Sequence, residues 1–168
     1  MYITIGTGVG AGIVSNGRVL EGVLNPNVGH ITVARHPKDT FPGNCPIHKD
    51  CLEGLISNNA IRERKNLENV DKCSDVSDDD EIWDFISYYL GQLCLSLLYI
   101  LSTEKIIIGG GVINRESLLK KTRDSFISIN NNYVDHPNLR KENIDNFITR
   151  TNFKNYSGII SAFNLYNS

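Results

Sequence analysis

The sequence predicts an α/β domain in which helices pack on a mixed sheet. Two short runs rich in β-branched residues, at 2–6 and 105–108, are typical of buried strands. Between them, apolar residues repeat at helical spacing over 82–101, and a glycine turn after the second run leads into a further helix. This order of strand, helix, strand and helix predicts a layered α/β domain.

The composition fits one globular domain with a hydrophobic core. The chain has 168 residues, 40% of them hydrophobic, and its 17 basic residues nearly balance its 19 acidic ones. A net charge of −2 argues against a nucleic-acid partner, since such proteins usually carry a basic surplus. No apolar run reaches the ~18 residues that a membrane span needs, and no signal peptide is visible. We therefore expect a cytoplasmic protein with no membrane partner.

The first predicted strand, 2–6, begins directly after Met1, so we expect another segment of the protein to precede this chain. The strand runs into Gly6-Thr7-Gly8-Val9-Gly10-Ala11-Gly12, which is too rich in glycine to stay extended and is expected to bend closely around something. Next, Asn16-Gly17 is the two-residue signal for a tight hairpin between 13–15 and 18–20. The hairpin predicts that the sheet is at least partly antiparallel.

A long loop is expected from 22 to 50, where Pro, Asn, Gly and His dominate and the single short apolar run is 31–33. Loops of this length inside a compact domain usually serve a site or are held by something other than a core. Helices are expected directly after this loop, over 52–64, and near the end of the chain, over 157–165.

The segment 71–81 is acidic and leads directly into the periodic helix. We prefer the interpretation that its last carboxylates cap that helix, because the helix dipole favours negative charge at the N-terminus. The alternative is an acidic binding tail. Beyond the second strand, Gly109-Gly110-Gly111 is expected to form a turn, and Asn114 to cap a helix over about 115–127.

Cysteine and histidine spacing predicts a metal site within the long loop. Cys45, His48 and Cys51 recur at three-residue intervals, a mixed set of ligands that favours tetrahedral Zn²⁺. The fourth ligand must come from elsewhere, and His30 and His36 are the upstream candidates. Four protein ligands would make the zinc structural, since no coordination position stays open. The alternatives are a Cys45–Cys51 disulfide or two unpaired thiols. Both are weaker interpretations if the chain is cytoplasmic.

Two glycine turns are candidates for a nucleotide site. The first, Thr7 to Gly12, could turn backbone N–H groups and the Thr7 hydroxyl toward phosphate oxygens. It leads into a hairpin, so neither the Rossmann nor the Walker pattern applies, and a purely steric use of its glycines stays open. The second, Gly109 to Gly111, lies between a strand and a helix, where a base or ribose could contact bare backbone. Taken alone, it fits a tight turn without a ligand equally well.

The order of these motifs is more specific than any one of them, and it closely resembles the ROK family of sugar kinases and regulators. The motifs are Thr7-Gly8-Val9-Gly10-Ala11-Gly12, Pro26-Asn27-Val28-Gly29-His30, His36-Pro37-Lys38-Asp39, Cys45-Pro46-Ile47-His48-Lys49-Asp50-Cys51-Leu52-Glu53-Gly54-Leu55 and Ile106-Ile107-Ile108-Gly109-Gly110-Gly111-Val112. The Cys-x2-His-x2-Cys form followed by Leu-Glu-Gly resembles the bacterial-type fructokinases, since the glucokinase branch carries three Cys there. The resemblance covers nearly the whole chain, through Ser157-Gly158-Ile159-Ile160-Ser161-Ala162.

The resemblance implies an actin-like ATPase (ribonuclease H-like) fold, with residues 1–168 forming the C-terminal lobe and 25–55 a zinc-stabilised, sugar-side loop subdomain. It implies that His30 is the fourth zinc ligand beside Cys45, His48 and Cys51. It also implies sugar contacts from Asn27, His30 and Glu53, where a carboxylate suits charge-assisted hydrogen bonds to hydroxyls. The implied ATP-binding residues are Thr7, Gly8, Gly10, Asn59, Gly109, Gly110, Gly111, Val112 and Ile113.

The sequence departs from the family pattern in three ways. Asn27 stands where the family usually has a sugar-binding Glu, and a neutral amide there would cost ~1 kcal/mol of sugar affinity. Ser57-Asn58-Asn59-Ala60 replaces the expected Ser-Gly-Pro-Ala, which would loosen the turn beside the nucleotide. The first lobe's Asp-x-Gly-Gly-Thr phosphate motif and the Asp that acts as general base are both missing. Losing a general base typically costs about 10²- to 10⁴-fold in rate, so we expect this chain to bind better than it catalyses.

The activity implied is transfer of the γ-phosphoryl group of Mg-ATP to the 6-hydroxyl of fructose, with the catalytic Asp expected in an N-terminal lobe. The implied ligands are fructose or a related hexose and ATP, and the implied protein partner is a second copy or a separate N-terminal lobe. The alternative function is a non-catalytic sugar- or nucleotide-binding ROK module.

Overall fold

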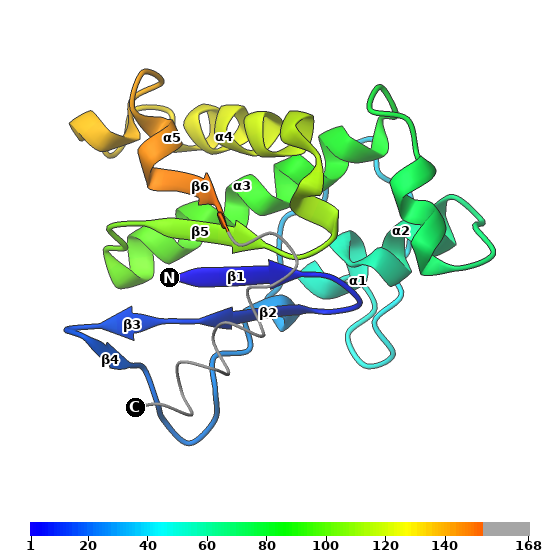
Figure 1. The fold of residues 1–168 in the computed structure, drawn as a ribbon, viewed down its shortest axis with the longest axis horizontal. Coiled ribbons are helices and arrows are strands. Elements are labelled where there is room, and N and C mark those ends of the chain that lie inside the picture. The colour runs from blue at the N-terminus through cyan, green and yellow to red at the C-terminus, as the bar shows by residue number, and fades with distance from the viewer. Residues whose placement is uncertain (153–168) are drawn as a thin grey trace.

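A mixed four-stranded sheet forms the centre of the computed structural model, which describes residues 1–152 apart from the side chains of 70–72 (Figure 1). The strand order is β2-β1-β5-β6, from β2 (Val9–Gly12) and β1 (Tyr2–Ile5) to β5 (Ile106–Gly109) and β6 (Ile148–Arg150). β1 pairs antiparallel with β2 and parallel with β5, which in turn pairs parallel with β6. The predicted mixed sheet is therefore confirmed, whereas the predicted helix over 157–165 and the motif at 157–162 lie outside the described residues.

The glycine-rich segment is more extended than its composition predicted. The chain bends tightly at residues 6–8, where the Gly6 N–H donates to the Gly8 carbonyl at 2.9 Å, and then forms β2. β2 pairs with β1 in continuous register from Ile5↔Val9 to Tyr2↔Gly12. The prediction of a bend through Gly12 is wrong because the ladder with β1 satisfies the backbone of β2 without help from side chains.

The predicted hairpin is confirmed as β3 (Val14–Ser15) and β4 (Arg18–Val19). Its two turn residues, Asn16 and Gly17, both have positive φ, of 52° and 73°. These values belong to the tight turn whose twist matches that of the flanking strands.

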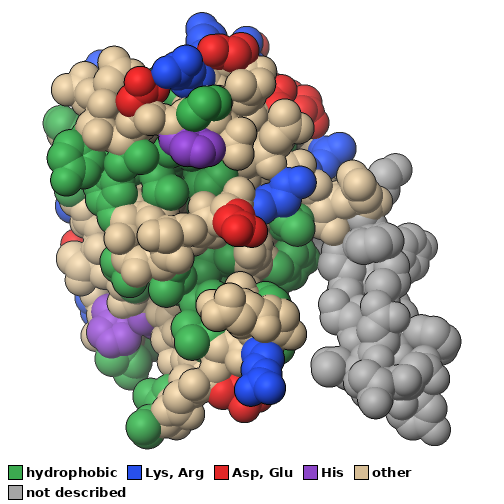
Figure 2. Space-filling view, turned by 90° about the vertical axis from the view of Figure 1, so that its left-hand side faces the viewer, with side chains coloured by type: hydrophobic (Ala, Val, Ile, Leu, Met, Phe, Trp, Pro, Cys, Tyr) green, Lys and Arg blue, Asp and Glu red, His purple; other side chains and the backbone are tan. Residues whose placement is uncertain are grey.

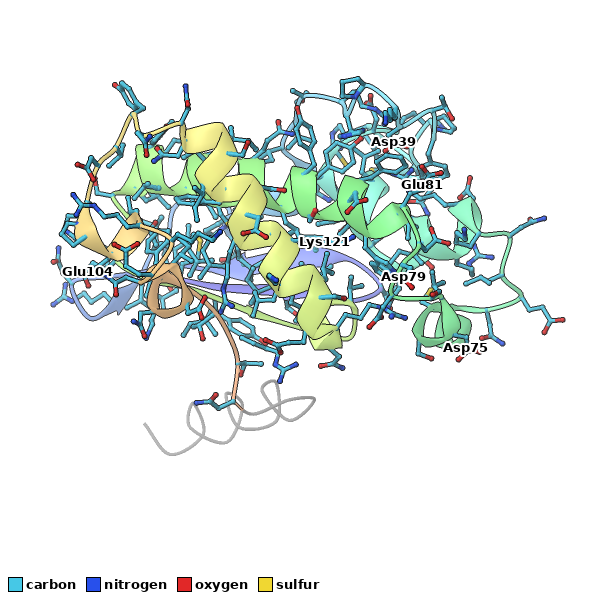
Figure 3. All side chains as sticks on the ribbon, turned by 90° about the horizontal axis from the view of Figure 1, so that it is seen from above. Asp39, Asp75, Asp79, Glu81, Glu104 and Lys121 are labelled. Carbon is cyan, nitrogen blue, oxygen red and sulfur yellow. The ribbon has the colours of Figure 1, made fainter. Side chains whose placement is uncertain are left out.

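A long helix, α3 (Ile82–Leu101), lies against one face of the sheet, and α4 (Glu116–Asn130) packs across α3 near the β6 edge (Figure 3). The bounds of α3 match the predicted 82–101. By length and hydropathy alone α3 could cross a membrane, but 56% of its most apolar window is buried inside the protein. Gly91 permits the close crossing of the two helices, because a Cβ there would approach that of Ser125 to 2.8 Å. α3 is therefore a core helix by its packing.

The helix expected over 52–64 is two helices, α1 (Leu52–Ile56) and α2 (Asn58–Arg64), separated at Ser57. Ser57 is extended, with φ −66° and ψ 163°, and its hydroxyl accepts a hydrogen bond from the Ala60 N–H at 3.2 Å. A serine oxygen in this position caps a new helix, which explains why the prediction of one continuous helix is wrong.

The remaining segments are short. The long loop, which its composition predicted, contains the 3₁₀ turn η1 (Val28–His30). The acidic stretch contains η2 (Val70–Asp75), and Asp80 then accepts a hydrogen bond from the first residue of α3 at 3.1 Å, in agreement with the capping interpretation. The further short elements are η3 (Val112–Asn114), η4 (Pro137–Leu139) and α5 (Ile144–Phe147). Asn114 was the wrong cap for α4, since it lies inside η3 and Arg115 occupies the N-cap position.

Candidate metal and sugar-side site

Four side chains of the long loop converge at one point. The ligand atoms of His30, Cys45, His48 and Cys51 all lie within 4.8 Å of one another. The Nδ1 atom of His30 is 3.9 Å from Cys45 Sγ and 3.6 Å from Cys51 Sγ, and His48 Nδ1 is 3.8 Å from Cys45 Sγ. Around a tetrahedral Zn²⁺ with ordinary bond lengths, sulfur and nitrogen ligands are about 3.6 Å apart. The donor set and its spacing therefore fit zinc.

The knuckle, residues 45–51, brings its own three ligands together by backbone geometry. Cys45 and Lys49 exchange two backbone hydrogen bonds, of 3.1 and 3.0 Å, and Lys49 adopts a positive φ of 58°. This tight loop also directs the His48 N–H toward Cys45 Sγ at 3.5 Å. Such N–H groups lower the pKa of the Cys45 thiol, whereas burial raises the pKa of Cys51. A lowered pKa favours the thiolate, which is the form that binds metal.

Two glycines let the knuckle pack against its neighbours. Gly43 has a φ of +84°, and a Cβ there would approach the Lys49 carbonyl oxygen to 2.2 Å. A Cβ on Gly54, in α1, would approach the same oxygen to 2.0 Å. Side chains at either position would displace the Lys49 carbonyl and, with it, the turn that aligns the ligands.

The structure also decides between the upstream histidines. His36 lies away from the cluster, with its ring against Phe85 at 4.9 Å and Tyr88 at 5.1 Å, so His30 is the residue that joins the knuckle. The thiols of Cys45 and Cys51 are free, so the alternative of a disulfide between them is not what the structure shows.

Glu53 links the cluster to the sheet. Its Oε2 accepts a hydrogen bond from the Val9 N–H at the start of β2, at 2.8 Å, and its Oε1 lies 3.9 Å from His30 Nε2. A Cβ on Gly8 would come within 2.7 Å of the same carboxylate, so the glycine leaves room for it. The side chains of Glu53 and His30 remain 25% and 38% exposed, so both are accessible to a ligand. Asn27 precedes η1 three residues before His30, and its amide donates to the Asn25 carbonyl at 2.8 Å.

The two glycine turns meet at the start of α2. The Asn58 N–H donates to the Gly6 carbonyl at 2.8 Å, and the Asn59 amide donates to the Thr7 carbonyl at 3.3 Å. On the other side, a Cβ on Gly111 would lie 3.7 Å from the Asn58 amide nitrogen. The turns after β1 and β5 are neighbours because these strands are parallel and end at the same edge of the sheet.

Not all of the predicted nucleotide residues lie at this meeting point. Gly10 lies within β2, opposite Thr4, rather than in the turn. The side chains of Val112 and Ile113 are 4% and 1% exposed, so these two residues could contact a nucleotide through their backbone alone.

Comparison with known proteins identifies the group to which the chain belongs. The family model described as "ROK family" matches residues 1–168. The chain is a member of the ROK family. A putative fructokinase of Bacillus subtilis is 38% identical over 162 residues, which cover 96% of this chain and 52% of that protein. A fructokinase of Lactococcus lactis subsp. cremoris is 39% identical over 139 residues, 82% of this chain and 46% of that protein.

Solved structures of ROK proteins share the fold. The ROK hexokinase of Thermus thermophilus matches with a TM-score of 0.70 at 19% identity, covering 99% of this chain and 58% of that one. A ROK glucokinase of Streptomyces griseus, solved with glucose and AMPPNP, matches with a TM-score of 0.67 at 21% identity, covering 98% of this chain and 59% of that one. The likeness supports the actin-like fold that the sequence implied, and the chain spans about half the length of the curated relatives it matches.

One polar centre of this ROK chain was not predicted from the sequence. The carboxylate of Asp39, which is 1% exposed, accepts hydrogen bonds of 2.5 and 2.8 Å from Arg64 and one of 2.6 Å from the Tyr89 hydroxyl. Burial raises the pKa of Asp39, but the hydrogen bonds from Arg64 and Tyr89 outweigh it and lower the pKa to about 2. Asp39 ends the motif His36-Pro37-Lys38-Asp39, but its partners are 25 and 50 residues away, so sequence spacing gave no sign of the contact.

Proposed function

We propose that this ROK chain contributes the sugar-side and nucleotide-side contacts of an ATP-dependent fructokinase that phosphorylates the 6-hydroxyl of fructose. Five curated relatives that carry the name fructokinase, one of them as putative, share 32–39% identity with it. Within the chain, the observation that carries the proposal is the position of Glu53, an accessible carboxylate held between β2 and a histidine of the metal cluster.

Glu53 and His30 are arranged to bind a hydroxyl between them. Their facing atoms, Oε1 and Nε2, are 3.9 Å apart, too far for a direct hydrogen bond but close enough for one hydroxyl oxygen to reach both at about 2.8 Å. When Nδ1 of His30 binds metal, Nε2 carries the proton and donates to the hydroxyl oxygen. The hydroxyl then donates its own proton to Glu53, which is a charge-assisted bond. Asn27, three residues before His30, supplies a neutral amide to the same sugar.

The metal in this proposal is a structural Zn²⁺ held by His30, Cys45, His48 and Cys51. Four protein ligands close its coordination shell, so the ion would order the loop and fix the His30 ring without generating hydroxide. The residues themselves do the recognition, since His30 and Glu53 present the donor and the acceptor to the sugar.

Mg-ATP is the proposed co-substrate, and it would bind where the two glycine turns meet. Thr7, Gly8 and the backbone of 109–113 offer N–H groups and one hydroxyl to phosphate and ribose oxygens. Phosphoryl transfer depends mostly on positioning and on a well-placed base. Neither the Asp-x-Gly-Gly-Thr phosphate motif nor the motif of the family's general-base Asp occurs in this sequence, so in the proposed enzyme both come from an N-terminal lobe.

A second candidate function, a non-catalytic ROK module that binds sugar or nucleotide, is favoured by one observation. The motif of the general-base Asp does not occur in this sequence, whereas Glu53 and the two glycine turns that would bind sugar and nucleotide are present.

A coupled kinase assay with fructose and Mg-ATP tests the proposal, first on this chain alone and then with the separately produced amino-terminal half of the Bacillus subtilis relative. We expect no turnover from the chain alone and turnover from the mixture. Turnover by the chain alone would show that it carries its own base. A mixture that binds both ligands but stays inactive would favour the binding module.

Calorimetric titration with fructose tests the sugar contacts without catalysis. Glu53→Gln replaces a charge-assisted bond by a neutral one, so we expect binding about fivefold weaker. Glu63→Gln, an exposed change on the neighbouring α2, is the matched control and should leave the affinity unchanged. Equal affinity in both variants would remove Glu53 from the sugar site.

A further inference from the structure

The buried carboxylate of Asp39 contacts two helices and one residue of its own loop. Arg64 of α2 binds both of its oxygens, and the Tyr89 hydroxyl of α3 binds Oδ2. The Phe41 N–H donates to Oδ1 at 3.1 Å. Asp39 therefore joins the long loop to two helices through one side chain that has almost no contact with water.

The same network reaches both stems of the knuckle. On the first stem, Asp39 binds the Phe41 N–H, and Arg35 donates to the Phe41 carbonyl. On the second stem, Arg64 also donates to the Leu55 carbonyl of α1 at 3.2 Å. Phe41 lies four residues before Cys45, and Leu55 lies four residues after Cys51. The distance between the two stems is thus set from outside the knuckle.

Tyr89 anchors this network to the hydrophobic core. Its ring is fully buried in α3, while its hydroxyl donates to Asp39 and accepts from the His36 N–H at 3.2 Å. Arg64 in turn stacks on the Phe41 ring, with Cζ 4.2 Å from its centroid. The loop that carries the metal ligands is therefore positioned relative to the core by hydrogen bonds that meet at Asp39.

We propose that Asp39 is a positioning residue for the metal cluster: through Arg64 and Phe41 it holds the two stems of the knuckle so that the four ligands are arranged before the metal arrives. The inference rests on the proposed function in that the cluster binds Zn²⁺. Without Asp39 the stems separate, and the metal must order the loop as it binds, which lowers its affinity. Groups that hydrogen-bond metal ligands directly typically change metal affinity 10- to 100-fold, and because Asp39 acts one contact further away we expect the lower end of that range.

Zinc affinity measured by competition with a chromophoric chelator tests the proposal on the purified chain. Asp39→Asn keeps the shape of the side chain but removes its charge, and we expect zinc to bind about tenfold more weakly. Asp84→Asn is the matched control, since Asp84 also pairs with a cation, Lys121 at 2.5 Å, but is 60% exposed and lies outside the network. The control should bind zinc like the unchanged protein.

The visible spectrum of the Co²⁺-loaded protein separates positioning from general stability. Cobalt in a tetrahedral site of two thiolates and two imidazoles absorbs strongly, and we expect Asp39→Asn to alter the bands because its ligands are held differently. Asp39→Asn with a lower melting temperature but unchanged zinc affinity and cobalt spectrum would overturn the inference.

Tyr89→Phe provides a second test of the proposal in case Asp39→Asn fails to fold. It removes one hydrogen bond to Asp39 and leaves the buried ring, so we expect a smaller loss of zinc affinity in the same direction, and no loss would count against the proposal. An unchanged protein that binds no zinc would instead refute the metal assignment in the proposed function. An unchanged protein that binds zinc but no fructose would leave this inference intact.

Discussion

The long loop at 22–50 and the helix pair of α3 and α4 are held in place by different forces. In α3, 12 of 20 residues are buried, and apolar side chains fill the space against α4 and the sheet. The loop buries few apolar side chains, and between Val33 and Cys45 its buried polar residue is Asp39. Side-chain amides and hydroxyls tie it to α3 instead, as where Gln92 exchanges two hydrogen bonds with the backbone of Ala34.

This difference means that the two regions respond to different conditions. Apolar burial depends little on pH or on metal, whereas a loop held by the proposed metal cluster and by the Asp39 carboxylate depends on both. Because the loop carries His30 and Glu53 is anchored beside it, the proposed sugar contacts depend on the less robust of the two regions. The sheet and α3 provide a frame that persists when the loop does not.

Removing zinc should produce the largest difference between the two regions. Zinc binding provides about 10–16 kcal/mol in small zinc-dependent domains, so we expect a chelator to leave η1 and the knuckle, residues 28–30 and 45–51, open to amide hydrogen exchange. α3 and the contacts of Asp39 should stay protected. Hydrogen-exchange mass spectrometry with and without chelator measures both regions at once, and added zinc should restore the loop. Cys45→Ser should behave like the chelated protein, and Cys73→Ser, outside the cluster, should not. Equal exchange of the loop in both states would show that metal does not order it.

A cavity in the helix pair should have the opposite effect: it should lower the stability of the core and leave the loop's zinc binding unchanged. Phe126 is fully buried in α4, with its ring 5.6 Å from that of Phe147. Phe126→Ala should lower the free energy of unfolding by about 3–5 kcal/mol, because apolar contacts are lost and a cavity remains. Urea denaturation measures this loss, and Ile100→Ala, at a 77% exposed position of α3, is the control with little expected change.

Zinc affinity completes the contrast. We expect Phe126→Ala to bind zinc like the unchanged protein at temperatures where it is folded, because Phe126 has no part in the loop. A large loss of zinc affinity in this variant would mean that the two regions are coupled through the core, and not through Asp39 alone.

Local signals explain what the sequence could predict of the fold. Asn16-Gly17 requires two left-handed residues in succession, and the periodic segment at 82–101 extends over enough turns to fix its own ends, so both elements appear where expected. Ser57 and β2 were misjudged because their states depend on contacts outside the local pattern. Ser57 caps α2 and ends α1, while the pairing of β2 with β1 overrides the preference of its glycines.

The same distinction between local signals and distant contacts applies to the candidate site. The spacing of Cys45, His48 and Cys51 predicts a metal knuckle because one short loop positions all three. Nothing in that spacing separates His30 from His36, since the choice depends on how a distant turn folds back, and it was the family resemblance that named His30. Asp39 shows the limit most clearly. A buried carboxylate is defined by partners brought together in space, and Arg64 and Tyr89 come from two different helices.

Acid should weaken the hydrogen bonds by which Asp39 holds the loop. The loss of stability should be smaller than that from metal removal or from a core cavity. The pKa of Asp39 is lowered from 3.8 to about 2 in the folded protein, which at about 1.4 kcal/mol per pKa unit corresponds to about 2 kcal/mol of stability. Because the folded pKa is the lower one, this contribution is fully present above about pH 4 and is lost as the pH falls toward 2. Metal also dissociates in acid, so unfolding is measured in chelator at every pH.

Comparing the pH dependence of unfolding for the unchanged chain, Asp39→Asn and Asp135→Asn separates the contribution of Asp39 from other acid effects. The unchanged chain should lose about 2 kcal/mol more than Asp39→Asn between pH 5 and pH 2, because the amide has no proton to gain. Asp135→Asn is the control: a hydrogen bond from Arg140 lowers the pKa of Asp135 too, but the pair is exposed, so its loss should leave the profile unchanged. Parallel profiles for the unchanged chain and Asp39→Asn would show that burial cancels what Arg64 and Tyr89 provide. The charge of Asp39 would then add nothing to the anchoring of the loop.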